Sequence, residues 1–350
     1  MKTSFVSTLA GQNAMRNTIN RAQEELRKLQ TEVTTGKHED TGVTLGSGTS
    51  QVVNLKAELD RINSLKETNT VVGQRLSASQ VALDSMRQAG EKINTVLLSV
   101  LGSDDKTNLS IAKTDLTSSF QTFLGAANTR AFNGEYLMAG INTDAIPLAN
   151  YGPGSAAKTT FDNAKTAFMT SRGLASMADF TVADMEDFVK NTLEPHYTGA
   201  QWTVDWSQAS DQNIQSRISA NEVVQSSSNA NSTGVRMFAL ASVVGMELLD
   251  SGINSEVRTK LNVMVQNYAQ QSIAGLIREA SVLGVSQNRV EKANTTLQLQ
   301  TNLVDTHIGD LEDVDPYEAS TRMNTLLTQI QTSYTLTSRI QQMSLINFLK

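Results

Sequence analysis

Apolar side chains recur at helical spacing over most of the chain. The first such stretch runs from about Phe5 to Val33 and stops at a Thr-Thr-Gly sequence ending in Gly36. A second runs from about Gln51 to Leu101, and a shorter one follows from about Lys106 to Arg130. Apolar residues three or four positions apart lie on one face of a helix, so each stretch predicts an amphipathic helix.

Helical spacing returns in the C-terminal part, from Val235 to Leu249 and from about Ser255 to Leu311. A further helix is predicted to start after Asp315 and to run to Phe348. Asp315 is expected to be its N-cap, and Glu318 stands where it can complete a capping box.

The predicted helix from about Gln51 to Leu101 would be roughly 75 Å long and could not be stable alone. We therefore expect a mainly α fold, in which N- and C-terminal segments form a long antiparallel helical bundle or coiled coil. Three parts are predicted: terminal helices (1–45 and 312–350), a long-helix bundle (46–140 and 235–311), and a surface-exposed α/β insert (141–234).

The insert has a different residue pattern from the rest of the chain. It contains three of the four prolines and both tryptophans. Trp202, Val204 and Trp206 alternate, which predicts an extended strand, and residues 213–224 alternate in a similar way. Residues 181–193, which precede both of these segments, are predicted to form a short helix.

Composition excludes several classes of protein. The chain has no cysteine, which excludes disulfides, thiolate nucleophiles and Cys-ligated metals. The net charge of −6, without a Lys/Arg cluster, argues against a nucleic-acid partner. No segment approaches the ~18 apolar residues of a membrane span, and the N-terminus has no continuous apolar signal region, so we expect neither membrane insertion nor a cleaved signal peptide.

The residues typical of catalysis do not form a recognisable pattern. His38, His196 and His307 are scattered without metal-ligand spacing. The glycine-rich segment 42–50 lacks the Lys-Ser/Thr of a phosphate-binding loop. We therefore expect no enzyme activity, no catalytic residues, no metal and no cofactor.

The two terminal helices would form only a thin pair, which buries little area by itself. We expect them to order on assembly, against copies of the same chain or a neighbouring protein. The predicted assembly residues on their apolar stripes are Leu9, Met15, Ile19, Leu26, Leu29, Val33, Met323, Leu326, Ile330, Tyr334, Ile340, Leu345 and Phe348.

A short apolar patch interrupts the polar helical pattern after Arg130. Tyr136, Leu137 and Met138 stand between Gly134 and Gly140. We expect a hairpin-like turn that packs these three side chains against the ends of the long helices, so that the turn caps the helical domain and leads into the insert.

Both ends of the chain resemble the flagellin superfamily, which comprises flagellins and hook–filament junction proteins. At the N-terminal end the similar segments are "LRKLQTEVTTGK" and a long helix with Gln80, Ala82 and Leu83 near its end. At the C-terminal end they are "LGVSQNRVE", "IGDLEDVDPYEASTRMN" and "SLINFLK". The resemblance covers about residues 1–140 and 236–350, and the insert resembles nothing that we can name.

The patch separates members of the superfamily. The sequence from Gly134 to Gly140, Gly-Glu-Tyr-Leu-Met-Ala-Gly, is more similar to the Gly-x-Tyr-Leu-Phe-x-Gly of junction proteins than to flagellins. The resemblance implies an extracellular ring of copies between the proximal hook-associated protein and the flagellin filament. It also implies export by the flagellar type III apparatus, with a cytoplasmic chaperone on the C-terminal helix. Flagellin itself is the alternative, and an adhesin activity of the insert is a further one.

Overall fold

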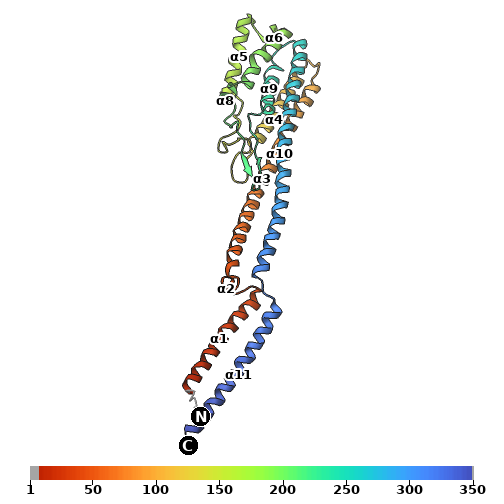
Figure 1. Ribbon diagram of the computed structural model, residues 1–350. Helices are drawn as coiled ribbons and strands as arrows, with labels where there is room; N and C mark the ends of the chain where they lie inside the picture. Colours follow the sequence, from red (N-terminus) through yellow and green to blue (C-terminus); the bar gives the residue numbers. More distant parts are fainter. Residues whose placement is uncertain (1–7, 349–350) are drawn as a thin grey trace. The chain divides into compact units, whose positions relative to one another are not determined.

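The computed structural model describes residues 8–348, without the side chains of residues 8, 9, 12, 340, 341 and 343–348. Most of the regular structure is helical (Figure 1). The predicted helices correspond to α1 (Thr8–Thr35), α3 (Thr49–Ser99), α4 (Lys106–Ala127), α9 (Thr233–Leu248), α10 (Ser255–Glu312) and α11 (Pro316–Phe348). The mainly α fold class is therefore confirmed. Phe5, the predicted start of the first helix, lies outside the described residues.

Shorter elements fill the connections. The glycine-rich loop after α1 contains α2 (Thr41–Leu45) and the 3-10 helix η1 (Gly46–Gly48). The insert contains α5 (Ala156–Arg172), η2 (Met177–Asp179), α6 (Val182–Asp187), the π-helix η3 (Phe188–Leu193), α7 (Glu194–Thr198), α8 (Gln201–Asp205), β1 (Gln215–Arg217) and β2 (Val223–Gln225).

The chain divides into two compact units, and the division falls inside α3 and α10. Met1–Ser64 and Gln298–Lys350 form one, named here the terminal unit, and Leu65–Leu297 forms the other, the central unit. The predicted division into terminal helices, bundle and insert stays a prediction.

In the terminal unit, α1 and α11 lie side by side (Figure 1). Their facing stripes contain the buried side chains Ile19, Leu29, Ala319 and Ile330. Because each helix has an apolar stripe on one face only, the two stripes pair and the remaining faces stay polar.

In the central unit, α3 and α10 run antiparallel. Gln80 Nε2 donates a 2.7 Å hydrogen bond to the carbonyl of Ala280, and a Cβ added to Gly90 would lie 3.1 Å from Cγ1 of Ile273. Residue numbers thus fall along α10 as they rise along α3. α4 also runs antiparallel to α3, because the tight turn after Ser99 reverses the chain. Asp105 caps α4 by accepting from the N–H of Thr107 at 2.7 Å.

The insert shares its hydrophobic core with the long helices. Buried residues of α3, α4, α9 and α10 form one cluster with those of α5 to α8. Phe123 of α4 stacks on Phe238 of α9, with ring centroids 3.6 Å apart. Trp202 and Trp206 stack at 5.7 Å within the same cluster. The middle segment is therefore packed onto the bundle and does not form a separate core.

One strand prediction is wrong. The segment around Trp202 forms the short helix α8, in which Trp206 N–H donates to the Trp202 carbonyl at 2.9 Å. Both tryptophans are buried, whereas Val204 is 70% exposed. Residues four apart share a helix face, so two tryptophans at this spacing satisfy a helix as well as a strand. Residues 213–224 do contain strands: β1 and β2 form an antiparallel pair in which Ser216 faces Val224.

Candidate assembly site

The predicted assembly stripe is used within the subunit, where α1 faces α11. Of the predicted residues, Ile19, Leu29 and Ile330 are buried there, and Met15, Leu26, Val33, Met323 and Leu326 are half-buried. Tyr334 is half exposed, and its hydroxyl accepts from Gln23 Nε2 at 2.7 Å. The side chains of Leu9, Ile340, Leu345 and Phe348 lie outside the described residues.

This pairing leaves much of the stripe partly open to solvent. Two helices cover each other along a single line, and the described side chains beside that line keep part of their apolar area exposed. A third element packed along the pair would bury this area. The α1–α11 pair is thus a surface that can gain stability by contact with another chain.

A small joint connects the end of α1 to the start of α11. Val314 N–H donates to the Gly36 carbonyl at 2.8 Å, and His38 N–H donates to the Glu312 carbonyl at 2.9 Å. Lys37 and Asp313 form an isolated antiparallel bridge. These main-chain contacts fix where the chain leaves one helix and begins the other.

A buried carboxylate stabilises the same joint. Lys56 and Lys37 both bind the Glu312 carboxylate, at 2.5 and 3.2 Å. The hydrogen bond from Lys56, together with that from Lys37, holds the pKa of Glu312 below its usual range, although burial acts in the opposite direction. This pairing is not predictable from the sequence pattern, because nothing local links Lys56 to a residue 256 positions away.

Only one half of the predicted capping box forms at the start of α11. Asp315 Oδ1 accepts from the N–H groups of Tyr317 and Glu318, at 2.8 and 3.3 Å. The Glu318 carboxylate pairs with Arg322 at 2.5 Å and does not return to Asp315. The reciprocal half of the predicted capping box is therefore replaced by an ion pair one helical turn further on.

The predicted turn residues Tyr136, Leu137 and Met138 lie inside the central unit. Leu137 and Met138 have no exposed surface, and Tyr136 is 6% exposed. The main chain here is tied to two distant segments. Leu137 N–H donates to the Thr129 carbonyl at 3.0 Å, and the Met138 carbonyl accepts from Ala230 N–H at 2.7 Å. The turn thus joins the end of α4 to the segment before α9.

Two arginines hold this turn from outside. The Arg130 guanidinium lies 4.4 Å from the centre of the Tyr136 ring and donates to its hydroxyl at 2.7 Å. From α3, Arg75 pairs with Glu135 and donates to the Tyr136 carbonyl at 3.2 Å. Hydrogen bonds from Asn133 and then Arg75 lower the pKa of the Glu135 carboxyl. The patch is therefore buried and hydrogen-bonded within the folded subunit.

Gly140 closes the turn where only glycine fits. Its φ is 62°, and a Cβ at this position would lie 2.5 Å from the carbonyl oxygens of Ser210 and Gln212. Two segments of the main chain therefore lie closer together here than a side chain at this position would allow.

The described residues hold no cluster of side chains suited to metal binding. The three histidines lie apart, His38 in the joint, His196 on α7 and His307 on α10. In the part of the chain that the structure describes, no group of three or more His, Asp or Glu side chains is placed to hold a metal ion. No helix between residues 8 and 348 is long and apolar enough to cross a membrane.

Comparison with known families agrees with this architecture at both ends. The bacterial flagellin N-terminal helical region matches residues 6–143, and the bacterial flagellin C-terminal helical region matches residues 266–349. The fold is similar to the solved structure of a protein assigned as a flagellar hook-associated protein from Vibrio parahaemolyticus. The TM-score is 0.52 and the identity 13%, over 76% of this chain and 97% of that one. No curated protein matches this sequence.

The paired terminal helices and the shared core of the bundle define a helical structural protein. The chain belongs to the flagellin family, and it is a structural protein of the bacterial flagellum. The family assembles outside the cell, so the surfaces that matter are those by which subunits meet.

Proposed function

We propose that this chain is a hook–filament junction subunit of the hook-associated protein 3 type. The observation that carries the proposal is the turn from Gly134 to Gly140. Its sequence is more similar to junction proteins than to flagellins, and its apolar side chains are fully used inside the central unit. The structural similarity to a protein assigned as hook-associated supports the same assignment.

In this role, copies assemble through the terminal unit into a ring. The partly exposed stripe residues of α1 and α11 are buried when neighbouring copies pack along the pair. At about 25 cal/mol per Å² of apolar area, 100 Å² buried per copy contributes roughly 2.5 kcal/mol. The expected partners are further copies, the proximal hook-associated protein on one side and flagellin on the other.

The subunit reaches this position by unfolded export through the flagellar type III apparatus. The absence of cysteine means that no disulfide has to be broken, and four prolines add few slow isomerisation steps on refolding. A cytoplasmic chaperone on the C-terminal helix would cover the apolar stripe of α11 before export.

An assembly experiment separates this role from that of a filament subunit. Purified full-length chain is mixed with isolated hooks that carry the proximal hook-associated protein, and with no hooks as the matched control. We expect saturable binding to hooks, and flagellin added afterwards should then extend a filament. Without hooks the chain should stay unpolymerised.

The alternative, flagellin, predicts the opposite behaviour. If the chain alone polymerises into long filaments when seeded with its own fragments, the junction assignment is wrong and the filament assignment is right. If the chain binds no hook and forms no filament, both roles fail.

A further inference from the structure

Asn133 and Gly134 lie at the tip of the turn that precedes Tyr136, and both are exposed. They form the only Asn-Gly pair in the sequence. An asparagine side chain cyclises most readily when glycine follows it, because no side chain on that glycine hinders the attack of its main-chain nitrogen on the asparagine Cγ. A Cβ added to Gly134 would meet no atom of the described chain within 4 Å, so the tip of the turn is also uncrowded.

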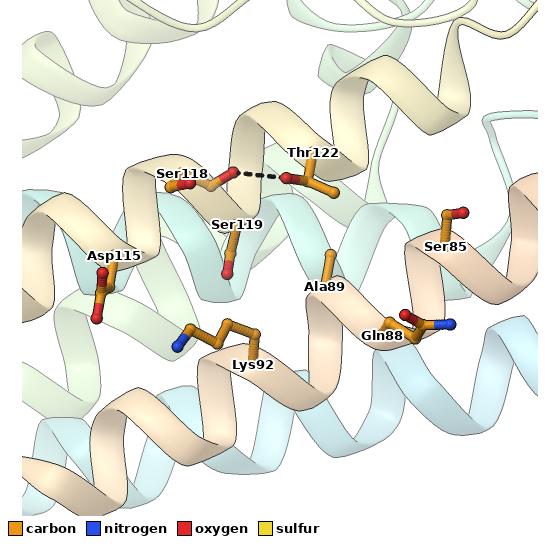
Figure 2. A pocket seen from close by; sticks show the side chains of 8 residues that line it. All are labelled: Ser85, Gln88, Ala89, Lys92, Asp115, Ser118, Ser119 and Thr122. Atoms are coloured by element: carbon orange, nitrogen blue, oxygen red, sulfur yellow. Dashed lines mark hydrogen bonds between the residues drawn. The ribbon is translucent and has the colours of Figure 1, made fainter.

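Amide side chains on the long helices are held differently. Gln88 of α3 lines the groove between α3 and α4 (Figure 2), and its Nε2 donates to the Asp84 carboxylate at 2.7 Å. In a regular helix each main-chain N–H is bonded to the carbonyl four residues earlier, so its nitrogen is not free to attack a side chain. Asn133, by contrast, lies in a turn outside any helix or strand.

Hydrogen bonds of the folded turn engage both reacting groups. The Gly134 N–H donates to the Ala131 carbonyl at 2.9 Å. Asn133 Oδ1 accepts from the Glu135 N–H at 3.2 Å, and the Asn133 side chain also hydrogen-bonds the Glu135 carboxylate. The Ala131 N–H closes the turn by donating to the Glu135 carbonyl at 2.7 Å. Cyclisation therefore requires that the turn open first.

We propose that Asn133 is a deamidation site that the folded turn protects. When the turn opens, the main-chain nitrogen of Gly134 attacks Cγ of Asn133. A new C–N bond forms, the bond from Cγ to the side-chain nitrogen breaks, and ammonia leaves with the proton of the Gly134 N–H. Water then opens the cyclic imide at either of its two carbonyl groups, which gives aspartate in one case and isoaspartate in the other.

Neither product fits the turn as asparagine does. Each places a carboxylate beside Glu135 where an amide donor stood, so repulsion between like charges replaces a hydrogen bond. Isoaspartate also adds a carbon atom to the main chain before Gly134, which displaces its N–H from the Ala131 carbonyl. The turn joins the end of α4 to the segment before α9, so the modification weakens the central unit. It marks chains that stay unfolded for long and spares those that fold promptly.

Deamidation of the purified full-length chain at mildly alkaline pH tests the proposal. One sample is kept folded and the other is unfolded in guanidinium chloride, and tandem mass spectrometry of digests quantifies the products at each asparagine. Asn254 is the matched internal control, because it is exposed, serine follows it, and its Oδ1 accepts from the Val257 N–H at 2.9 Å. We expect Asn133 to react on the order of tenfold faster in the unfolded sample than in the folded one.

In the unfolded sample Asn133 should also react faster than Asn254. Equal rates at these two asparagines would overturn the assignment of Asn133 as the site. Equal rates at Asn133 in the folded and unfolded samples would overturn its protection by the turn. Neither measurement uses hooks or filaments, so the inference goes beyond the proposed function and stands or fails separately from it.

A substitution in the turn tests the protection in the folded chain. Glu135→Gln removes the carboxylate that binds Asn133 and Arg75, and should speed deamidation of Asn133 about two- to fivefold, the effect of one surface ion pair. Glu186→Gln is the matched control, because Glu186 is about as exposed and pairs with Lys190 on a different segment. Thermal unfolding checks that both variants fold. An unchanged or lower rate at Asn133 in a Glu135→Gln chain that melts normally contradicts the protection.

Asn133→Asp reproduces one of the two products. The added charge should lower the melting temperature of the central unit by about 2–4 °C. Asn150→Asp, at another exposed position whose side-chain oxygen accepts from Gln121 Nε2, adds the same charge as a control. Equal melting of the two variants would overturn the claim that deamidation at Asn133 weakens the unit.

Discussion

Lys56 Nζ donates a 2.5 Å hydrogen bond to the Glu312 carboxylate, 256 positions further along the chain. Lys37 Nζ lies 3.2 Å from the other oxygen of the same carboxylate. Glu312 is 3% exposed, whereas both lysines are about half exposed. The joint between the terminal helices is therefore centred on one buried negative charge that two solvated cations neutralise.

Removing this charge should weaken the terminal unit. Glu312→Gln leaves two lysines without their acceptor and should cost about 1–3 kcal/mol. Hydrogen exchange of α1 and α11 amides at neutral pH measures the effect. Glu58→Gln is the matched control, because Glu58 forms only an exposed pair with Arg61, and such pairs contribute little. Equal exchange in the two variants would show that the buried charge does not hold the joint.

The same carboxylate predicts a pH dependence. The pKa of Glu312 is lower in the folded state than its ordinary value of 4.5. The unfolded state therefore binds the proton more tightly, so the stabilisation is complete well above pH 4.5 and is lost as the pH falls below it. The protection of α1 and α11 amides, measured relative to the intrinsic exchange rate at each pH, should fall in acid in the natural chain. In Glu312→Gln this acid-dependent loss of protection should be smaller, and an unchanged loss would assign it to other carboxylates.

The cap of α11 gives a more local prediction. Asp315→Ala removes the acceptor of the Tyr317 and Glu318 N–H groups and should cost about 1 kcal/mol of helix stability. The first turn of α11 should then fray, with faster cleavage there in limited proteolysis. Asp315→Asn, which keeps the acceptor, should behave like the natural chain. Cleavage that is equally rapid in the Asn and Ala variants would assign the effect to the lost charge.

The spacing of apolar residues predicted the long helices, because in each of them these residues form a continuous stripe along one helical face. The same pattern failed at Trp202 and Trp206, where a four-residue spacing fits a helical turn as well as alternation does. Sequence also placed Tyr136, Leu137 and Met138 in a turn, since glycines flank them.

The sequence pattern did not predict the contacts between segments that lie far apart along the chain. Glu312 stands in a run of acidic residues that reads as a helix end, and its lysine partners lie near the other end of the chain. Similarly, the stripe on α1 indicates an apolar contact without saying whether α11 or another copy makes it. Which segments pack against each other depends on how the whole chain folds, and the spacing of residues along the sequence does not determine this.

Gly140 and Gly134 provide a matched pair of substitutions in one turn. Both have positive φ, 62° and 85°, but a Cβ on Gly134 meets no atom within 4 Å, whereas one on Gly140 meets two carbonyl oxygens. Gly134→Ala should cost about 1 kcal/mol of backbone strain. Gly140→Ala should cost several times more, because two main-chain segments must also separate. Unfolding followed by tryptophan fluorescence measures both, since both tryptophans lie in the central unit. Equal costs would show that the close approach at Gly140 is not required.

Leu137 and Ile330 test whether the two apolar sites have different roles. Leu137→Ala removes a fully buried side chain of the central unit and should cost about 2–4 kcal/mol. The tryptophan-detected melting temperature should fall accordingly. Ile330→Ala should leave that temperature unchanged, because Ile330 lies in the terminal unit, but it should speed proteolysis of α11 and reduce attachment to hooks. Leu336→Ala, at a position 48% exposed on the same helix, is the control for general effects of truncation on α11. If Leu137→Ala melts normally and yet fails to attach, the turn is a docking surface between proteins and its assignment to the folding of the subunit is wrong.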